Sequence, residues 1–360
     1  MKKYKNKLVI VQTVTPDYRS EFFKEIKKNL HANFEIYAGN FYFDKSISSK
    51  GTLEKKTIKN YFFLNRKLLF QTGIWHLLFK NVVLVLEMNP RIISNWIFLI
   101  VRNLLNKETI LWGHAWSKSG KDSNSEKLRY LMKRLSSKII VYTNKQKAEL
   151  QLKMPTKIII AAPNSLISKT KMVTQKPKES LNLIYVGRLT EQKKPLFLVK
   201  VFIKNIDQYP KNTNLIIVGA GIETKKIENF LKANKVKNRV KLMGHIYDYA
   251  ELKKLYSNAF FSVSPSLAGL SITQSFSFGV PILISEFEKH GPELEAVQIG
   301  SNALFFKTDS IESFNETLCL AFKNKDFWVE QRQSIVNFCK NEYSIEAMSK
   351  VFINLCDKNF

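Results

Sequence analysis

The sequence predicts an α/β protein built from two doubly wound, Rossmann-like domains that face a cleft, and three observations support this fold class. The chain has 360 residues, which is more than one hydrophobic core usually organises. Short, almost continuously apolar segments alternate with amphipathic ones in both halves, as in parallel sheets covered by helices on both faces. Between the halves, residues 168–180 are polar, lysine-rich and contain a proline, which indicates a linker.

The first domain is expected over residues 1–167. Its expected strands are 7–13, 34–39, 81–87, 108–113, 138–143 and 157–163, with amphipathic helices at 20–30 and 125–135. The chain begins with basic and then apolar residues, but the apolar run is short and no small-residue cleavage site follows. We therefore interpret this start as a strand and not as a signal peptide. The apolar residues 92–101 are too few to span a bilayer.

The second domain is expected over residues 181–342. Its expected strands are 181–187, 213–219, 238–244, 258–265 and 280–285, with helices at 225–236, 249–258 and 271–278. Residues 343–360 contain an amphipathic pattern that predicts a C-terminal helix, which we expect to return toward the first domain. Ligands of open parallel sheets bind beyond the carboxyl ends of the strands, so the functional residues are expected there.

The net charge of +27 is unevenly distributed along the chain. Residues 1–180 hold 34 Lys and Arg against 12 Asp and Glu, a balance of +22, and the remainder holds 23 against 18, a balance of +5. One explanation is a lysine-rich solvated surface, and the other is an anionic partner of the first half. No nucleic-acid-binding motif is present, so nucleic acid is not expected as that partner. The three cysteines form no CxxC, which favours a reducing compartment.

A strand end in the second half carries fixed positive charge. Gly187 permits a sharp turn after the strand, Arg188 follows with a planar charged fork, and Lys193 adds an ammonium group. Further along, a glycine-containing loop opens the expected helix at 271–278, and a helix N-terminus attracts anions. We expect these three features to converge on one phosphate group. An ordinary surface arginine is the alternative for Arg188 taken alone.

The order of these elements resembles the retaining glycosyltransferases of family 4, the glycosyl transferases group 1, which have the GT-B fold. The matching stretches are YVGRLTEQKKPLFLV, LIIVGAGIETKKIENFL, NRVKLMGHIYDYAELKKLYSNAFFSVSPS, GLSITQSFSFGVPIL and GPELEAVQIGSNALFF. The resemblance implies that the second domain binds a nucleotide-diphosphate sugar. Arg188 and Lys193 would then hold the diphosphate and act in catalysis. The other implied donor-binding positions are Gly187 and Gly219, then Gly244 and His245 near the base, and Gly269, Leu270 and Ser271 at the sugar and distal phosphate.

The chain departs from the family where two glutamates usually stand eight residues apart. Ser266 and Gln274 occupy those positions. The resemblance implies that Gln274 contacts the ribose, for which its amide is suited, whereas the short Ser266 leaves the sugar contact open. Glu293 also resembles a donor-site position, and its alternative role is that of an acid in the first turn of a helix.

Four residues at strand ends of the first half are candidates for the acceptor side: Tyr18, Arg19, Glu87 and Asn89. His114 follows the expected strand 108–113, and the resemblance favours it as a catalytic proton acceptor or hydrogen-bond donor. A histidine held by backbone is the alternative there, and a surface turn is the alternative for Tyr18 and Arg19.

The resemblance, which is to members that build capsule, O-antigen and lipopolysaccharide, implies a function. The chain would move a sugar, with retention, from a nucleotide-diphosphate sugar to a glycan or lipid-linked acceptor in cell-surface polysaccharide synthesis. No DxD motif occurs, so neither a metal nor another cofactor is expected. The cationic first half favours a cytoplasmic protein that is peripheral on the inner membrane face. Residues 55–70, which are basic and aromatic, are the expected contact, with an ordinary amphipathic helix as the alternative. The alternative functions are a GT-B nucleotide-sugar epimerase and a non-catalytic homologue.

Overall fold

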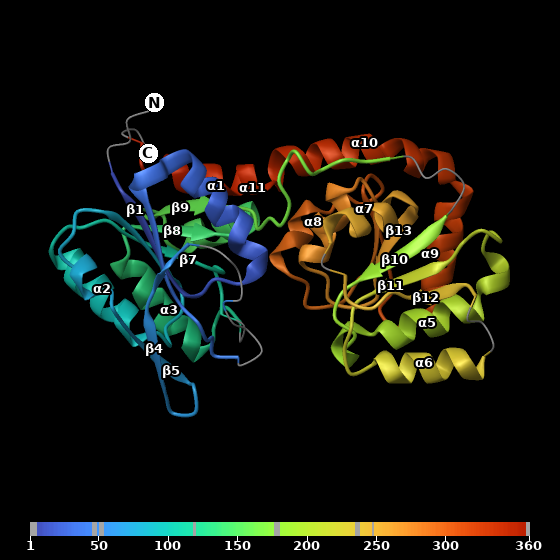
Figure 1. Ribbon diagram of the computed structural model, residues 1–360, viewed down its shortest axis with the longest axis horizontal. Coiled ribbons are helices and arrows are strands. Elements are labelled where there is room, and N and C mark those ends of the chain that lie inside the picture. Colours follow the sequence, from blue (N-terminus) through green and yellow to red (C-terminus); the bar gives the residue numbers. More distant parts are fainter. Residues whose placement is uncertain are drawn as a thin grey trace. The chain divides into compact units, whose positions relative to one another are not determined.

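The computed structural model describes residues 6–44, 49, 54–117, 120–175, 181–234, 238–246 and 248–357. The chain divides into two compact α/β units (Figure 1). Unit 1 consists of Met1–Leu166 together with Ile345–Phe360, and unit 2 consists of Ile167–Ser344. Each unit contains a parallel sheet with helices packed against it, so the predicted pair of Rossmann-like domains is confirmed.

Unit 1 is built on a seven-stranded sheet in the order β3-β2-β1-β6-β7-β8-β9, and all its neighbouring strands are parallel. The strands are β1 (Leu8–Val14), β2 (Phe34–Gly39), β3 (Lys56–Thr57), β6 (Val83–Glu87), β7 (Thr109–Trp112), β8 (Lys138–Val141) and β9 (Ile158–Ala161). Its helices are α1 (Ser20–Leu30), α2 (Ile93–Leu104), α3 (Asn124–Leu135), α4 (Asn144–Lys153) and α11 (Ile345–Asn354), and its 3-10 turns are η1 (Asp17–Arg19), η2 (His31–Asn33) and η3 (Trp75–Leu77).

The central strands of unit 1 are buried on both faces, which explains their continuous apolar character. In β1, Leu8 and Ile10 pack into a cluster with Phe22 of α1 and Phe352 of α11. Val9 belongs to a different cluster, shared with residues of α2 and α3. Because successive side chains of a strand point to opposite faces, helices must cover both sides of the sheet.

Residues 59–72 form an antiparallel hairpin of β4 (Lys59–Phe63) and β5 (Leu68–Thr72), separate from the main sheet. The alternative interpretation of residues 55–70 as an amphipathic helix is therefore wrong. The chain turns through Leu64, Asn65 and Arg66, all three with positive φ. Alternation along β4 leaves Tyr61 and Phe63 exposed.

Unit 2 is built on a six-stranded parallel sheet in the order β12-β11-β10-β13-β14-β15. The strands are β10 (Asn182–Val186), β11 (Leu215–Val218), β12 (Val240–Leu242), β13 (Ala259–Ser264), β14 (Ile282–Ser285) and β15 (Ala303–Phe306). The helices are α5 (Pro195–Lys204), α6 (Thr224–Ala233), α7 (Tyr249–Ser257), α8 (Leu270–Ser277), α9 (Ile311–Lys323) and α10 (Lys325–Glu342), and the 3-10 turns are η4 (Glu191–Lys193), η5 (Ile206–Gln208) and η6 (Pro292–Ala296).

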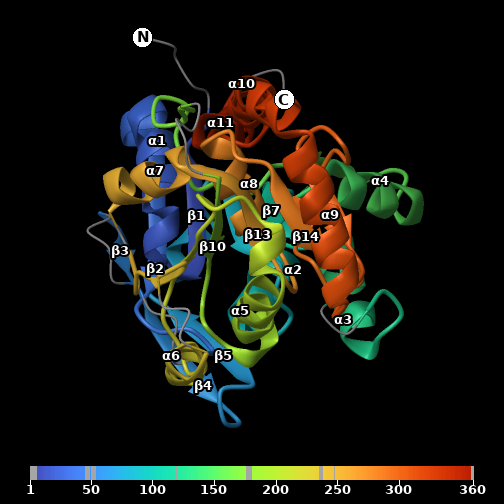
Figure 2. The ribbon, with the colours of Figure 1, turned by 90° about the vertical axis from the view of Figure 1, so that its right-hand side faces the viewer.

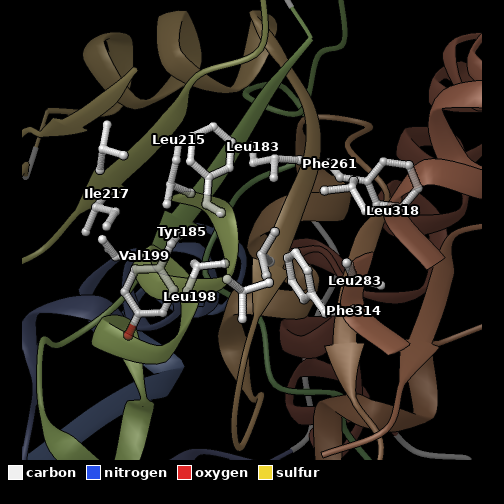
Figure 3. Packing of buried hydrophobic residues seen from close by; sticks show 14 of the residues in the cluster. Leu183, Tyr185, Leu198, Val199, Leu215, Ile217, Phe261, Leu283, Phe314 and Leu318 are labelled. Carbon is white, nitrogen blue, oxygen red and sulfur yellow. The ribbon is translucent and has the colours of Figure 1, made fainter. Parts of the chain in front are cut away.

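The core of unit 2 joins its sheet to the helices on one face (Figure 3). Leu183 and Tyr185 of β10 pack in one cluster with Leu198 of α5, and Phe314 of α9 lies in the same cluster. This packing fixes where β10 ends, and the loop that follows the strand carries the predicted phosphate-binding residues.

The C-terminal helix α11 belongs to unit 1, where it packs against α1 (Figure 2). The boundary before unit 2 lies between Leu166 and Ile167. Of the predicted linker 168–180, residues 176–180 lie outside the described chain. Its first part packs on unit 2, because Met172 is buried and the Thr174 hydroxyl accepts a hydrogen bond from Arg332 Nε at 3.2 Å. Among the described helices, none has the length and apolarity to cross a membrane.

Candidate functional site

Backbone contacts tie together the loops that follow β10, β11 and β12, which lie side by side in unit 2. The N–H of Gly187 donates to the carbonyl of Val218 at 3.0 Å, and the N–H of Gly219 donates to the carbonyl of Gly244 at 2.7 Å. Gly219 has φ of +147°, and a Cβ there would lie 1.9 Å from the Gly187 carbonyl oxygen. Only glycine fits such an approach, so the three predicted glycines bring three strand ends together.

The two predicted cations follow β10. Arg188 is exposed, and its guanidinium makes no hydrogen bond or ion pair with a described residue. Its backbone is fixed, because the Tyr185 hydroxyl donates to the Arg188 carbonyl at 2.9 Å. Lys193 ends η4 and is half-buried, with Nζ donating to the Leu267 carbonyl at 2.8 Å. The loop before α8 therefore holds the ammonium group in place.

The charges around Lys193 act on its pKa. Burial lowers the pKa of the Lys193 ammonium, the positive charge of Arg188 lowers it further, and the Glu293 carboxylate opposes both. The neighbouring Lys194 has a different role, because its ammonium pairs with Glu288 and Asp309 at 2.8 Å each. The Lys193 ammonium is thus the one whose pKa responds to the charge of Arg188, whereas the Lys194 ammonium is engaged by two carboxylates.

The loop before α8 is held from the opposite side by residues that follow β14. The N–H of Ala268 donates to His290 Nδ1 at 3.0 Å, and the N–H of Gly291 donates to the Ala268 carbonyl at 2.6 Å. Glu293 is buried, and its Oε2 would lie 3.5 Å from a Cβ placed on Gly269. These contacts bring the predicted Gly269 and Glu293 together at the start of α8.

The N-terminus of α8 lacks a capping side chain. Gly269 occupies the N-cap position, and the predicted Leu270 and Ser271 form the half-buried first turn. The first N–H groups of a helix have no partner within it, and Gly269 at the N-cap has no side chain that could satisfy them. This end of α8 is therefore open to an anion, as the sequence predicts for the phosphate.

Two buried polar side chains lie at this site. Ser266 is 1% exposed, and its hydroxyl makes no hydrogen bond in the described chain. His290 Nδ1 accepts from the Ala268 N–H, and the backbone of Glu286 and Ser285 also interacts with the ring. Burial lowers the pKa of His290 and these backbone contacts oppose the shift, so the ring is neutral at neutral pH and Nε2 carries the proton. Buried polar groups are normally paired, so the Ser266 hydroxyl can bond a ligand.

The remaining residues predicted for the donor side have fewer contacts with the residues described above. Gln274 is half-buried on α8, one turn after Leu270, and its amide makes no hydrogen bond with a described residue. Gly244 has φ of +68° with open space around its Cα, and His245 beside it is exposed. Sequence reasoning missed His290 as a site residue, although its position in the loop after a predicted strand was an available signal.

In unit 1, the structure gathers most of the predicted acceptor-side residues around Tyr142. Arg19 is buried, with its guanidinium carbon 4.6 Å from the Trp112 ring centroid and its Nη2 donating to the Tyr142 hydroxyl at 3.4 Å. The His114 ring is exposed and lies 4.8 Å from the Tyr142 ring. Tyr18 is exposed and lies beside Arg19. Arg19 is thus buried and held by aromatic rings, which differs from the surface turn that was its alternative interpretation.

Glu87 ends β6 within the same electrostatic environment. Its carboxylate accepts hydrogen bonds from the Thr13 N–H at 2.6 Å and the Thr13 hydroxyl at 2.9 Å. Burial raises the pKa of Glu87, and the Thr13 bonds and the charge of Arg19 oppose this shift. Tyr142 was missed in the sequence, although it directly follows β8, as the other members of this group follow their strands.

Asn89 has a structural role in this unit. Its Oδ1 accepts from the Arg91 N–H at 3.1 Å, and its own N–H donates to the Glu87 carbonyl at 2.8 Å. These bonds form a local turn after β6. No group of His, Cys, Asp and Glu among the described residues could hold a metal ion. A cavity of about 480 Å³ between α1 and the β2–β3 edge contains none of the predicted site residues.

Comparisons with known proteins agree with this architecture. Residues 167–341 match the family model described as Glycosyl transferases group 1. An uncharacterised glycosyltransferase of Haemophilus influenzae is 25% identical over 336 residues, which are 89% of this chain and 90% of that protein. The crystal structure of HepE from Anabaena in complex with UDP superposes with a TM-score of 0.69 and 12% identity, over 97% of this chain and 99% of HepE. The lipopolysaccharide outer core galactosyltransferase WaaB superposes with a TM-score of 0.67 and 15% identity, over 97% and 98%.

Proposed function

We propose that this chain, which has the GT-B fold and matches the Glycosyl transferases group 1 model over residues 167–341, is a glycosyltransferase that uses a nucleotide-diphosphate sugar and retains the anomeric configuration. One observation carries the proposal. Two cations, Arg188 and Lys193, stand at one loop cluster, and Lys193 is bonded to the loop that opens the uncapped α8. A diphosphate fits this combination of a planar fork, an ammonium group and a helix N-terminus.

The reaction breaks the bond between the anomeric carbon and the diphosphate oxygen, and forms a bond from that carbon to the acceptor oxygen. The electron pair of the broken bond leaves with the diphosphate, while the acceptor proton passes to a phosphate oxygen or to His114. Arg188, Lys193 and the N-terminus of α8 stabilise the negative charge that develops on the leaving group. One such preplaced donor is typically worth roughly 3 kcal/mol in the transition state. We propose that these groups act without a metal, in keeping with the absence of a DxD motif.

The sugar is proposed to lie against the loop before α8. The unpaired Ser266 hydroxyl can bond a sugar hydroxyl, and Glu293 supplies a carboxylate next to Gly269. Gln274 is proposed to bond the ribose, with the base near Gly244 and His245. In unit 1, Tyr18, Arg19, Glu87 and His114 are proposed to form the acceptor side around Tyr142, with Asn89 shaping its turn.

The acceptor is proposed to be a glycan or lipid-linked molecule of cell-surface polysaccharide synthesis, handled at the inner face of the membrane. The balance of +22 in residues 1–180 supports an anionic surface as a partner. The likeness to WaaB, a lipopolysaccharide galactosyltransferase, and to HepE, solved with UDP, supports the choice of pathway and donor.

A thermal-shift screen of nucleotide sugars tests the donor site. We expect one donor to raise the melting temperature of the wild type, and Arg188→Ala to remove most of that rise. Lys211→Ala is the matched control, because it removes an exposed cation from the same unit away from the site. Addition of EDTA should leave the stabilisation unchanged. If no nucleotide sugar stabilises the wild type, or if Arg188→Ala responds like the wild type, the proposal is wrong.

Incubation of the identified donor by itself separates transfer from epimerisation, since the alternative enzyme of this fold needs no acceptor. We expect the sugar to be recovered with its original configuration at every centre, and an epimerised sugar would instead establish the alternative.

A further inference from the structure

Two neighbouring helices of unit 1, α2 and α3 (Figure 1), carry exposed apolar side chains. On α2, Ile97, Ile100 and Leu104 are 36%, 47% and 76% exposed. Their spacing of three and four residues places them on one side of the helix. A surface helix normally presents polar side chains there, so this side of α2 lacks the usual solvated face.

The adjacent helix α3 also exposes apolar side chains. On α3, Leu128 and Leu131 are 54% and 48% exposed, and Tyr130 between them is 39% exposed. The α2–α3 face is defined here by its six exposed apolar residues, Ile97, Ile100, Leu104, Leu128, Tyr130 and Leu131. Apolar groups of this kind on two adjoining elements mark a surface that binds a partner.

No acidic side chain of α2 or α3 is exposed on the α2–α3 face. Glu126, the single acid within α2 and α3, is 5% exposed and is held by Lys133 Nζ at 2.5 Å. Arg102, the single charged residue of α2, is also buried, with its guanidinium donating to backbone carbonyls. The exposed charges of these two helices are those of Lys127 and Arg134, and both are positive.

We propose that the α2–α3 face docks on a lipid bilayer that contains anionic phospholipids. Apolar side chains of a helix lying in the interface enter the boundary between head groups and acyl chains, and a tyrosine suits the head-group level. Lys127 and Arg134 add attraction to anionic head groups, which no exposed carboxylate of these helices opposes. Such a one-signed charge pattern fits a negative membrane surface better than a protein partner of mixed charge.

This inference deepens the proposed function, because it names the surface through which a membrane-peripheral enzyme would bind. It differs from the expectation that residues 55–70 make the contact. That segment forms the β4–β5 hairpin, which exposes Tyr61, Phe63 and Leu64. The two surfaces therefore need separate variants in one experiment.

Co-sedimentation of the full chain with vesicles tests the proposal. The vesicles contain phosphatidylcholine either by itself or mixed with phosphatidylglycerol. We expect the wild type to bind the mixed vesicles, less at high salt, and the double variant Ile100→Glu/Leu128→Glu to bind about tenfold more weakly. The matched control is Ile299→Glu/Leu320→Glu, which makes the same change of charge at exposed apolar positions of unit 2 and should bind like the wild type.

Three results would overturn the inference: equal binding by the wild type and Ile100→Glu/Leu128→Glu, loss of binding only in the hairpin variant Phe63→Glu/Leu64→Glu, or a wild type that binds no vesicles and instead dimerises through this face in light scattering. The donor-induced thermal shift is measured on the same variants without vesicles. Vesicle binding therefore tests the proposed membrane surface, and the thermal shift tests the proposed donor site independently of it.

Discussion

At the scale of single residues, Lys193 links burial to the pH dependence of donor binding. Burial and Arg188 lower the pKa of its ammonium group, so it loses its charge at a lower pH than an ordinary lysine. We expect donor affinity to fall as the pH rises through that lowered pKa. Loss of a charge-assisted bond should weaken affinity by about tenfold to a hundredfold. Isothermal titration with the identified donor, at neutral and at alkaline pH, measures this change.

Lys193→Arg tests the assignment of that pH dependence, because a guanidinium stays charged over the whole range. Its donor affinity should be nearly constant with pH. An equal alkaline loss in Lys193→Arg and in the wild type would show that another group titrates.

Glu87 gives a second prediction at this scale, on stability. Burial raises its pKa in the folded state above the unfolded value, so the protonated form favours folding. Its favourable contribution is present below the ordinary glutamate pKa and is lost as the pH rises through the raised one. Glu87→Gln keeps an acceptor for the Thr13 N–H without this loss. We expect the variant to gain on the order of 1 kcal/mol relative to the wild type between mildly acidic and neutral pH.

Urea unfolding of the wild type and of Glu87→Gln at the two pH values gives the change in unfolding free energy with pH for each protein. The effect of Glu87 is the difference between these two changes. The comparison removes the contributions of all other titrating groups. A variant that loses stability relative to the wild type as the pH rises would contradict the raised pKa.

The residues proposed for the donor side share a signal in the sequence, because glycines and cations directly follow strands. Gly219 is required by its close approach to the Gly187 carbonyl, whereas Gly244 has positive φ and open space at its Cβ. Ser266 carries no such signal. Its hydroxyl becomes notable only when three-dimensional packing buries it without a hydrogen bond. Tyr142 was missed for the same reason, since its contacts with Arg19 and His114 are long-range.

At the scale of elements, the loops after β10 and β11 depend on a glycine that no other residue can replace. Gly219→Ala would place a Cβ 1.9 Å from the Gly187 carbonyl at φ of +147°. The backbone must shift, and we expect a loss of about 2–4 kcal/mol in unfolding free energy. Thermal and urea unfolding measure it.

Gly244→Ala is the matched control for that substitution. Gly244 also has positive φ, but a Cβ there would meet nothing within 4 Å. We expect only the conformational cost of about 1–2 kcal/mol. Equal losses in Gly219→Ala and Gly244→Ala would mean that the close approach of the two loops does not matter.

Strands were predictable where both faces are buried. The apolar runs of β1, β6 and β10 are recognisable because helices cover both sides of the sheet. The strand β15 was not predicted; it lies at the edge of its sheet, and its middle residues Leu304 and Phe305 are only half-buried. The β4–β5 hairpin was missed because its turn residues Leu64, Asn65 and Arg66 contain no glycine, although all have positive φ.

At the scale of the whole molecule, the chain order has a consequence for folding. Unit 1 is completed by Ile345–Phe360, so the whole of unit 2 is inserted between its two parts. The sequence predicted a C-terminal helix from its amphipathic pattern. The burial of Phe352 shows what the helix contributes, since its ring lies 5.1 Å from that of Phe22 and 4.8 Å from that of Trp112. The core of unit 1 is therefore incomplete until the last residues are in place.

Phe352→Ala tests this dependence. Truncation of a fully buried phenylalanine leaves a cavity between α1, α11 and the sheet, and we expect a loss of about 3–5 kcal/mol in the stability of unit 1. Phe79→Ala, at a 69% exposed position of the same unit, should change stability by less than about 0.5 kcal/mol. Calorimetry measures both variants with and without the donor, which is proposed to bind unit 2. In Phe352→Ala, a lowered transition that the donor does not raise would belong to unit 1. If instead the donor-raised transition falls and the other stays, α11 stabilises unit 2, and its assignment to the core of unit 1 is wrong.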